Sequence, residues 1–142
     1  MREDIQFDAD GTTLRGWFYR PDDADGEVPC IVMTHGFSAV KEMHIDEYAE
    51  VFCNAGLACV VYDHPGFGAS DAAPGRPRQE IDPWEQIRGY QHGITYAQMR
   101  PEVGGPQTAL LDDLLQRRDE RLPDRVVEVV ALLDDQVDRL AF

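Results

Sequence analysis

Two apolar runs, each ending at a glycine-containing segment, constrain the fold of this chain more than any other feature. Val28–Thr34 leads into His35–Ser38 (His-Gly-Phe-Ser), and Leu57–Tyr62 leads into Asp63–Ser70 (Asp-His-Pro-Gly-Phe-Gly-Ala-Ser). Apolar runs of this kind are typical of strands buried on both faces of a parallel sheet. The segment between them, Glu42–Ala55, has apolar residues at a helical period. Strand, glycine loop, helix and strand predict a right-handed crossover unit.

Further elements are predicted on both sides of this unit. Ile5–Ala9 and Leu14–Tyr19 are short apolar and aromatic runs, and the Asp-Gly pair between them favours a hairpin turn. Asp82 and Pro83 are typical of a helix start. The apolar residues that follow recur at three and four positions: Ile87, Tyr90, Ile94 and Ala97. The expected fold is α/β, with two antiparallel strands, two parallel strands and crossover helices.

The last part of the chain has a different pattern. A Gly-Gly-Pro breaker at 104–106 precedes it, and Gln107–Phe142 contains no strand-like run and no Ser, His, Cys or Lys. Two groups of apolar residues are spaced as in helices: Leu110, Leu111, Leu114 and Leu115, then Val126, Val130, Leu133, Val137 and Leu140. We therefore predict an α/β domain over residues 1–103 and a C-terminal helical hairpin over residues 104–142.

Composition and charge narrow the partners and the compartment. A formal net charge of −14 repels phosphate backbones and anionic lipid, so we expect neither a nucleic acid nor a membrane as partner. No apolar stretch approaches the roughly 20 residues of a membrane span, and the acidic N-terminus differs from a secretory signal. Cys30, Cys53 and Cys59 lie in apolar segments without paired spacing, as buried thiols do. A cytoplasmic location is expected.

Neither a metal nor a cofactor is expected. His35, His44 and His64, together with Asp63, follow predicted strands, but no pair has the short spacing of a known zinc motif. The Gly-Phe-Gly segment at 66–68 lacks the Gly-x-Gly-x-x-Gly pattern of a phosphate cradle, and no Lys lies near it.

Residues 1–103 resemble the α/β-hydrolase superfamily, and within it the dienelactone-hydrolase-like and dipeptidyl-peptidase-like esterases. The resemblance rests on a His-Gly pair after the first buried strand and on Asp-x-Pro-Gly-x-Gly-x-Ser after the second. The matching residues are His35, Gly36, Asp63, Gly66, Gly68 and Ser70. The resemblance implies that the His-Gly loop supplies a backbone N–H to an oxyanion hole, which stabilises the tetrahedral intermediate of acyl transfer. By position, that donor is Phe37.

The resemblance implies a hydrolase of small-molecule ester or peptide-like acyl substrates, but the catalytic triad has no counterpart here. The sequence contains no Gly-x-Ser-x-Gly elbow, and residues 104–142 contain no Ser or His. We therefore expect a chain that is truncated relative to the superfamily and inactive, or nearly so, by itself. A frameshift, a truncation or a fusion would each produce this pattern.

Three side chains within the α/β part are the remaining candidate nucleophiles. Ser38 could act with His35 or His64 as its base, but a helix cap or a place in the oxyanion loop is the favoured role. Ser70 is expected to be a turn hydroxyl that bonds nearby backbone amides. An unconventional role for Cys30 is the last alternative.

The strand Ile31–Thr34 is expected to lie at a sheet edge, because its neighbour in the superfamily is the strand before the elbow. Uncovered apolar edges pair with other chains. We therefore predict that the tail helices cover this edge or that the chain self-associates through it. An alternative function is a non-enzymatic scaffold whose acidic helical hairpin binds a partner.

Overall fold

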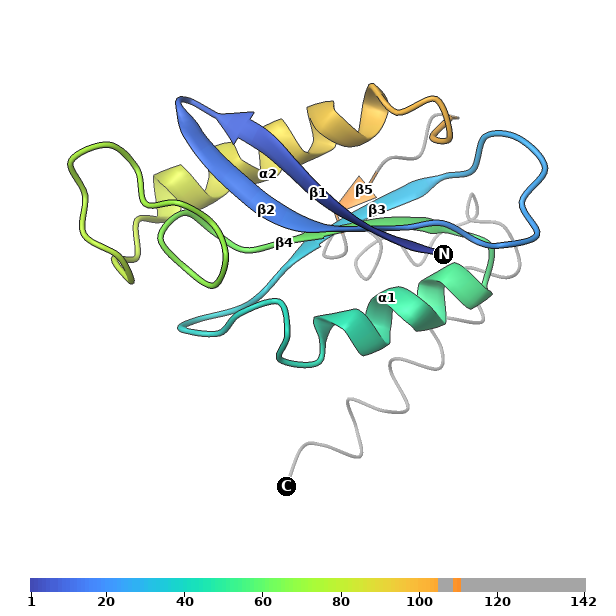
Figure 1. Ribbon diagram of the computed structural model, residues 1–142, viewed down its shortest axis with the longest axis horizontal. Coiled ribbons are helices and arrows are strands. Elements are labelled where there is room, and N and C mark those ends of the chain that lie inside the picture. The colour runs from blue at the N-terminus through green and yellow to red at the C-terminus, as the bar shows by residue number, and fades with distance from the viewer. Residues whose placement is uncertain (105–108, 111–142) are drawn as a thin grey trace.

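The computed structural model describes residues 1–104 and 109–110. Within these residues the elements follow in the order β1 (Arg2–Ala9), β2 (Thr12–Tyr19), β3 (Cys30–Thr34), α1 (Ile45–Asn54), β4 (Ala58–Tyr62), α2 (Pro83–Gln98) and β5 (Ala109–Leu110). The strands form one sheet in the order β1-β2-β4-β3-β5 (Figure 1). The predicted α/β architecture is confirmed: β1 and β2 are antiparallel, and β3 and β4 are parallel.

The β1–β2 hairpin turns where the Asp-Gly pair predicts it. Asp10 and Gly11 have φ values of 53° and 81°, the left-handed conformation that a two-residue hairpin turn requires. Both strands are longer than the apolar runs, because the pairing extends β1 outward to Arg2, opposite Tyr19, and extends β2 toward the turn to Thr12, opposite Ala9. On β1 only alternate residues are buried, so this strand has one face on the core and one in solvent.

The core lies on both faces of the parallel strands β3 and β4. On one face Ile31 and Val61 belong to a cluster with Phe52 of α1. On the other face Val32 belongs to a cluster with Ala97 of α2. Successive side chains of a strand point to opposite faces, so the two helices cover opposite sides of the sheet (Figure 1). The unbroken apolar runs are explained by this double burial.

The two helices differ from the predicted patterns in different ways: α1 in where it begins, and α2 in which side chains it buries. α1 begins at Ile45 instead of Glu42, because His44 at its N-cap has a left-handed φ of 71° that no helix can include. α2 begins at Pro83 as predicted, and the Asp82 carboxylate accepts hydrogen bonds from the first amides of the helix. Ile87, although part of the predicted stripe, is 48% exposed.

Two glycines take the place of large side chains on the buried face of α2. A Cβ on Gly89 would lie 3.3 Å from the Tyr62 hydroxyl, and one on Gly93 would lie 3.2 Å from Val32 Cγ1. The helix axis therefore approaches the sheet more closely than larger residues would allow.

No helix within the described residues is long and apolar enough to cross a bilayer.

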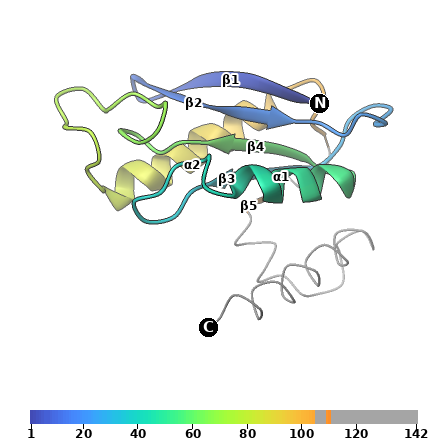
Figure 2. The same cartoon turned by 60° about the horizontal axis from the view of Figure 1, so that its bottom comes forward.

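The outer edge of β3 is partly paired, which corrects the prediction for the tail. Ala109 and Leu110 form β5, which pairs in parallel with Ile31 and Val32 (Figure 2). The sequence pattern predicts no strand after residue 107 and places Leu110 in a helix. The unpaired N–H and C=O groups of β3 provide hydrogen bonds that override this local preference. The remainder of the predicted helical hairpin, on which the scaffold alternative rests, lies outside the described residues.

Deleting residues 107–142 is expected to promote self-association. The deletion removes β5 and leaves the apolar edge of β3 without its strand partner, and such edges pair with other chains. Sedimentation velocity over a range of concentrations measures this association. A monodisperse monomer at every concentration would contradict the prediction.

Candidate functional site

The two glycine-containing loops lie beside each other at the carboxyl ends of β3 and β4. The parallel register places Thr34 opposite Tyr62, so His35 and Asp63 leave the sheet at the same edge. The Thr34 hydroxyl donates to the Tyr62 carbonyl at 2.8 Å and joins the two strand ends. This is the edge at which open α/β sheets bind their ligands. The sequence motifs are thus brought together.

The carboxylate of Asp63 is the buried centre of this edge. Its Oδ1 accepts the backbone N–H of Lys41 at 2.8 Å. Its Oδ2 accepts Lys41 Nζ at 2.7 Å and the backbone N–H of Ala69 at 3.0 Å. A fully buried carboxylate requires such pairing, because burial of an uncompensated charge is very unfavourable. Asp63 therefore ties the loop after β3 to its own loop after β4.

The glycines of the second motif are explained by this packing. Gly68 has a φ of 46°, and a Cβ there would lie 2.2 Å from Asp63 Oδ2. Gly66 has a φ of 78°, and its backbone pairs with Asp71 and Gln79. Both glycines therefore allow the loop to adopt its conformation around the buried carboxylate.

Ser70 closes the same loop against the N-terminal hairpin. Its buried hydroxyl donates to the Asp63 carbonyl at 2.6 Å and accepts the backbone N–H of Arg15 at 2.9 Å. The expected bond to a backbone amide is present, but the amide belongs to β2 and is 55 residues away in sequence. The hydroxyl is thus a long-range link between β2 and the loop.

His35 and His64 face each other with ring centroids 4.9 Å apart. His35 Nε2 accepts the backbone N–H of His64 at 3.1 Å, which assigns the ring proton to Nδ1. Nδ1 lies 3.0 Å from the carbonyl oxygen of Gly36 and donates to it. Both nitrogens of His35 are therefore engaged, and this ring has no free lone pair to serve as a base for Ser38.

The turn after His35 presents Phe37 to solvent. The backbone N–H of Ala39 donates to the Gly36 carbonyl, and Ser38 adopts a left-handed φ of 57°. The helix-cap prediction for Ser38 is wrong, because α1 begins seven residues later, at Ile45, and its N-cap is His44. Phe37 is 88% exposed, and its backbone N–H has no acceptor within residues 1–104. An N–H that is free on a turn of this kind can donate to an oxyanion.

The residues weighed as a metal site come together only in part: His35 Nε2 lies 3.7 Å from Asp63 Oδ1, and the rings of His35 and His64 face each other. His44 is exposed and contacts Glu47 at 3.0 Å, away from the buried pair of histidines. No group of three or more His, Cys, Asp or Glu in the described part of the chain is arranged to hold a metal ion.

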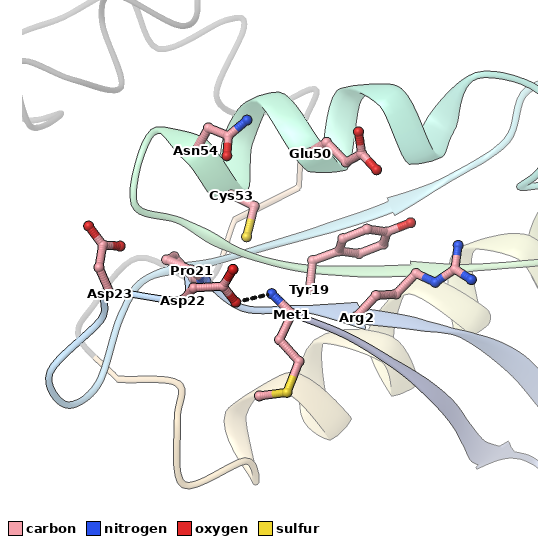
Figure 3. A pocket seen from close by; sticks show the side chains of 9 residues that line it. All are labelled: Met1, Arg2, Tyr19, Pro21, Asp22, Asp23, Glu50, Cys53 and Asn54. Carbon is pink, nitrogen blue, oxygen red and sulfur yellow. Dashed lines mark hydrogen bonds and ion pairs between the residues drawn. The ribbon is translucent and has the colours of Figure 1, made fainter.

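A separate hollow of about 480 Å³ lies at the other end of the sheet (Figure 3). Tyr19, which lines this hollow, pairs with Cys59 near the start of β4, so the hollow lies at the end of the sheet opposite the glycine loops. Burial raises the pKa of the Cys53 thiol in this hollow, so the thiol is not activated. The lining residues are Met1, Arg2, Tyr19, Pro21, Asp22, Asp23, Glu50, Cys53 and Asn54. None of them belongs to the glycine loops.

Burial keeps the His64 ring neutral. The ring packs against Tyr62 and Tyr90, and its Nδ1 is buried without a hydrogen-bond partner. Desolvation, reinforced by the neighbouring His35, lowers the pKa of His64 from 6.5 to about 4. The folded state therefore binds a proton at this ring only at a much lower pH than the unfolded state does.

His64→Leu is expected to weaken the acid destabilisation of the fold. Below about pH 6.5 the unfolded state gains a proton that the folded state excludes until about pH 4. The free energy of unfolding therefore falls as the pH falls through this window. The loss is about 3 kcal/mol for a pKa shift of this size. Urea unfolding across the window measures the free energy, with the exposed His44→Gln as control. Equal pH dependence in His64→Leu and the unmodified chain would contradict the assignment.

No family model matches the chain. Several curated proteins are similar to it in sequence. A thiohydrolase of Aspergillus aculeatus is 42% identical over 94 residues, which are 66% of this chain and 28% of that protein. The polyketide transferase grgF of Penicillium is 36% identical over 110 residues, 77% of this chain and 35% of that protein. The quorum-quenching protein AidA of Acinetobacter baumannii is 36% identical over 100 residues, 70% and 32% of the two chains. The chain thus spans about a third of the length of these relatives.

Solved structures share the arrangement of the elements. The crystal structure of the α/β hydrolase GrgF from Penicillium matches with a TM-score of 0.69 and 34% identity, covering 78% of this chain and 36% of that one. Est1E of Butyrivibrio proteoclasticus with bound ferulic acid matches with a TM-score of 0.62 at 23% identity, covering 75% of this chain and 41% of that one. At that identity the second match shows the fold alone. The chain has the α/β-hydrolase fold over about three quarters of its length.

Proposed function

We propose that the loop edge of this chain is one wall of an acyl-transfer site, in which Phe37 donates its backbone N–H to the oxyanion. The observation that carries the proposal is the free N–H of Phe37 on a turn that is anchored to a buried carboxylate. Such donors act on the negative charge that develops on the carbonyl oxygen in the transition state. The relatives named thiohydrolase and polyketide transferase support an acyl group in thioester or ester linkage as the substrate class.

We further propose that the chain does not catalyse acyl transfer by itself. A nucleophile needs a base within hydrogen-bond reach. Both functions of the Ser70 hydroxyl are used by backbone groups, and both ring nitrogens of His35 are engaged near Ser38. Burial raises the pKa of Cys30 to about 12, which keeps its thiol protonated and unreactive.

A fluorophosphonate is expected to leave the chain unmodified. This reagent reacts with activated serines. The Ser70 hydroxyl is held by backbone groups, and in the described part of the chain the Ser38 hydroxyl makes no hydrogen bond to a histidine. Intact-mass spectrometry detects the adduct, with an active serine hydrolase as positive control. A stoichiometric adduct that is lost in Ser38→Ala or in Ser70→Ala would locate a nucleophile and overturn the proposal of inactivity.

The oxyanion role is tested in a chimera in which residues 1–103 replace the matching segment of the Penicillium polyketide transferase. Phe37→Pro removes the backbone N–H and is expected to lower kcat for an acyl thioester about 10²- to 10³-fold. KM is expected to change little. Phe37→Ala is the matched control, because it removes the exposed ring but keeps the N–H. Equal kcat values for the two variants would show that the N–H does not act on the transition state.

A further inference from the structure

The turn that carries Phe37 is held at both ends by consecutive residues of the loop after β4. At its start, His35 Nε2 accepts the backbone N–H of His64. At its end, the backbone N–H and Nζ of Lys41 both donate to the carboxylate of Asp63. The span between these anchors is residues 36–40, and it is closed internally by the bond from Ala39 to Gly36. The direction of the Phe37 N–H therefore depends on two fixed ends.

The anchor at Lys41 is an unusual use of a lysine. It is the sole lysine of the sequence, and it is only 4% exposed. Its ammonium contacts Asp63 at 2.7 Å and Glu42 at 2.8 Å, and lies 4.7 Å from the ring centroid of Trp17. Removing an ammonium and a carboxylate from water is unfavourable, and a hydrophobic pair of similar volume often stabilises a fold as well or better. Stability alone therefore does not explain this pair.

We propose that Lys41 and Asp63 form an ionic clamp that holds the 36–40 turn in the conformation in which the Phe37 N–H is free to donate. They are positioning residues and touch no substrate. A buried pair suits this role, because its geometry is fixed by packing and solvent ions screen it weakly. The effect of the clamp on catalysis rests on the proposed function, in which Phe37 is the oxyanion donor. The effect of the clamp on the conformation of the turn can be measured without any activity.

Backbone ¹⁵N relaxation of the full chain tests the clamp directly. In the unmodified chain the Phe37 amide is expected to have an order parameter near 0.85, the value typical of rigid backbone, although its side chain is 88% exposed. A value below about 0.6 would overturn the proposal with no variant needed. In Lys41→Met, which keeps the length of the side chain and removes the charge, the order parameter of Phe37 is expected to fall below about 0.6.

Two controls separate the clamp from general loosening. Arg15→Met removes an exposed cation that contacts the same loop at Ala69 and Asp71, and is expected to leave the Phe37 amide unchanged. Glu42→Gln removes the negative charge of the half-exposed partner of Lys41 and is also expected to leave the order parameter of the Phe37 amide unchanged. Amides of the β1–β2 hairpin report whether each variant is folded. A folded Lys41→Met with a rigid Phe37 would overturn the proposal.

Asp63→Asn is the second variant, for use where Lys41→Met does not fold. It keeps the shape and one acceptor oxygen but loses the charge, and it is expected to loosen Phe37 in the same way. In the chimera, Lys41→Met is expected to lower kcat at least about tenfold with KM unchanged, because misplacement of a donor affects the transition state. If Phe37→Pro has no effect in the chimera while Lys41→Met still loosens the turn, the oxyanion role fails and the clamp stands. If the turn stays rigid, the clamp fails whatever Phe37→Pro does.

Discussion

The buried carboxylate of Asp63 is the interaction on which the arrangement of the loop edge depends. A charge with no exposure must be met by donors from several directions, and Lys41 and Ala69 meet it from two different loops. The lack of a side chain at Gly68 follows from the same requirement, since a Cβ would occupy the space of the carboxylate. One buried charge therefore determines residue types at positions that are far from each other in sequence.

The sheet supplies the position of this charge and the loops supply its partners. Parallel register brings the ends of β3 and β4 to one edge, and both strands are packed on both faces behind that edge. Ser70 then links the loop to β2, so the N-terminal hairpin also supports it. This hydrogen bond joins residues 55 positions apart, and the hydroxyl that accepts it is buried. The loops are thus fixed by contacts that ordinary surface loops lack.

The fold and part of the site could be predicted from local patterns. Unbroken apolar runs indicate buried parallel strands, the Asp-Gly pair indicates the hairpin, and Asp82 indicates the start of α2; all three depend on residues close in sequence. The partner of Asp63 could not be predicted, because Lys41 lies in another loop and only its status as sole lysine marks it. β5 was missed because two residues show no period, and their pairing is decided by β3.

The anchors of the Phe37 turn come entirely from residues within the described part of the chain. The residues that hold the two ends of the turn, His64 and Asp63, lie in the loop after β4, and neither contact needs a group from the remaining two thirds of the relatives' length. An oxyanion donor is effective when it is oriented before the charge develops, since reorientation during the reaction would offset the gain. The proposed donor is therefore held by the loops of the first crossover unit, and the N-terminal hairpin supports these loops. A nucleophile brought to this edge would meet a wall whose geometry is already set.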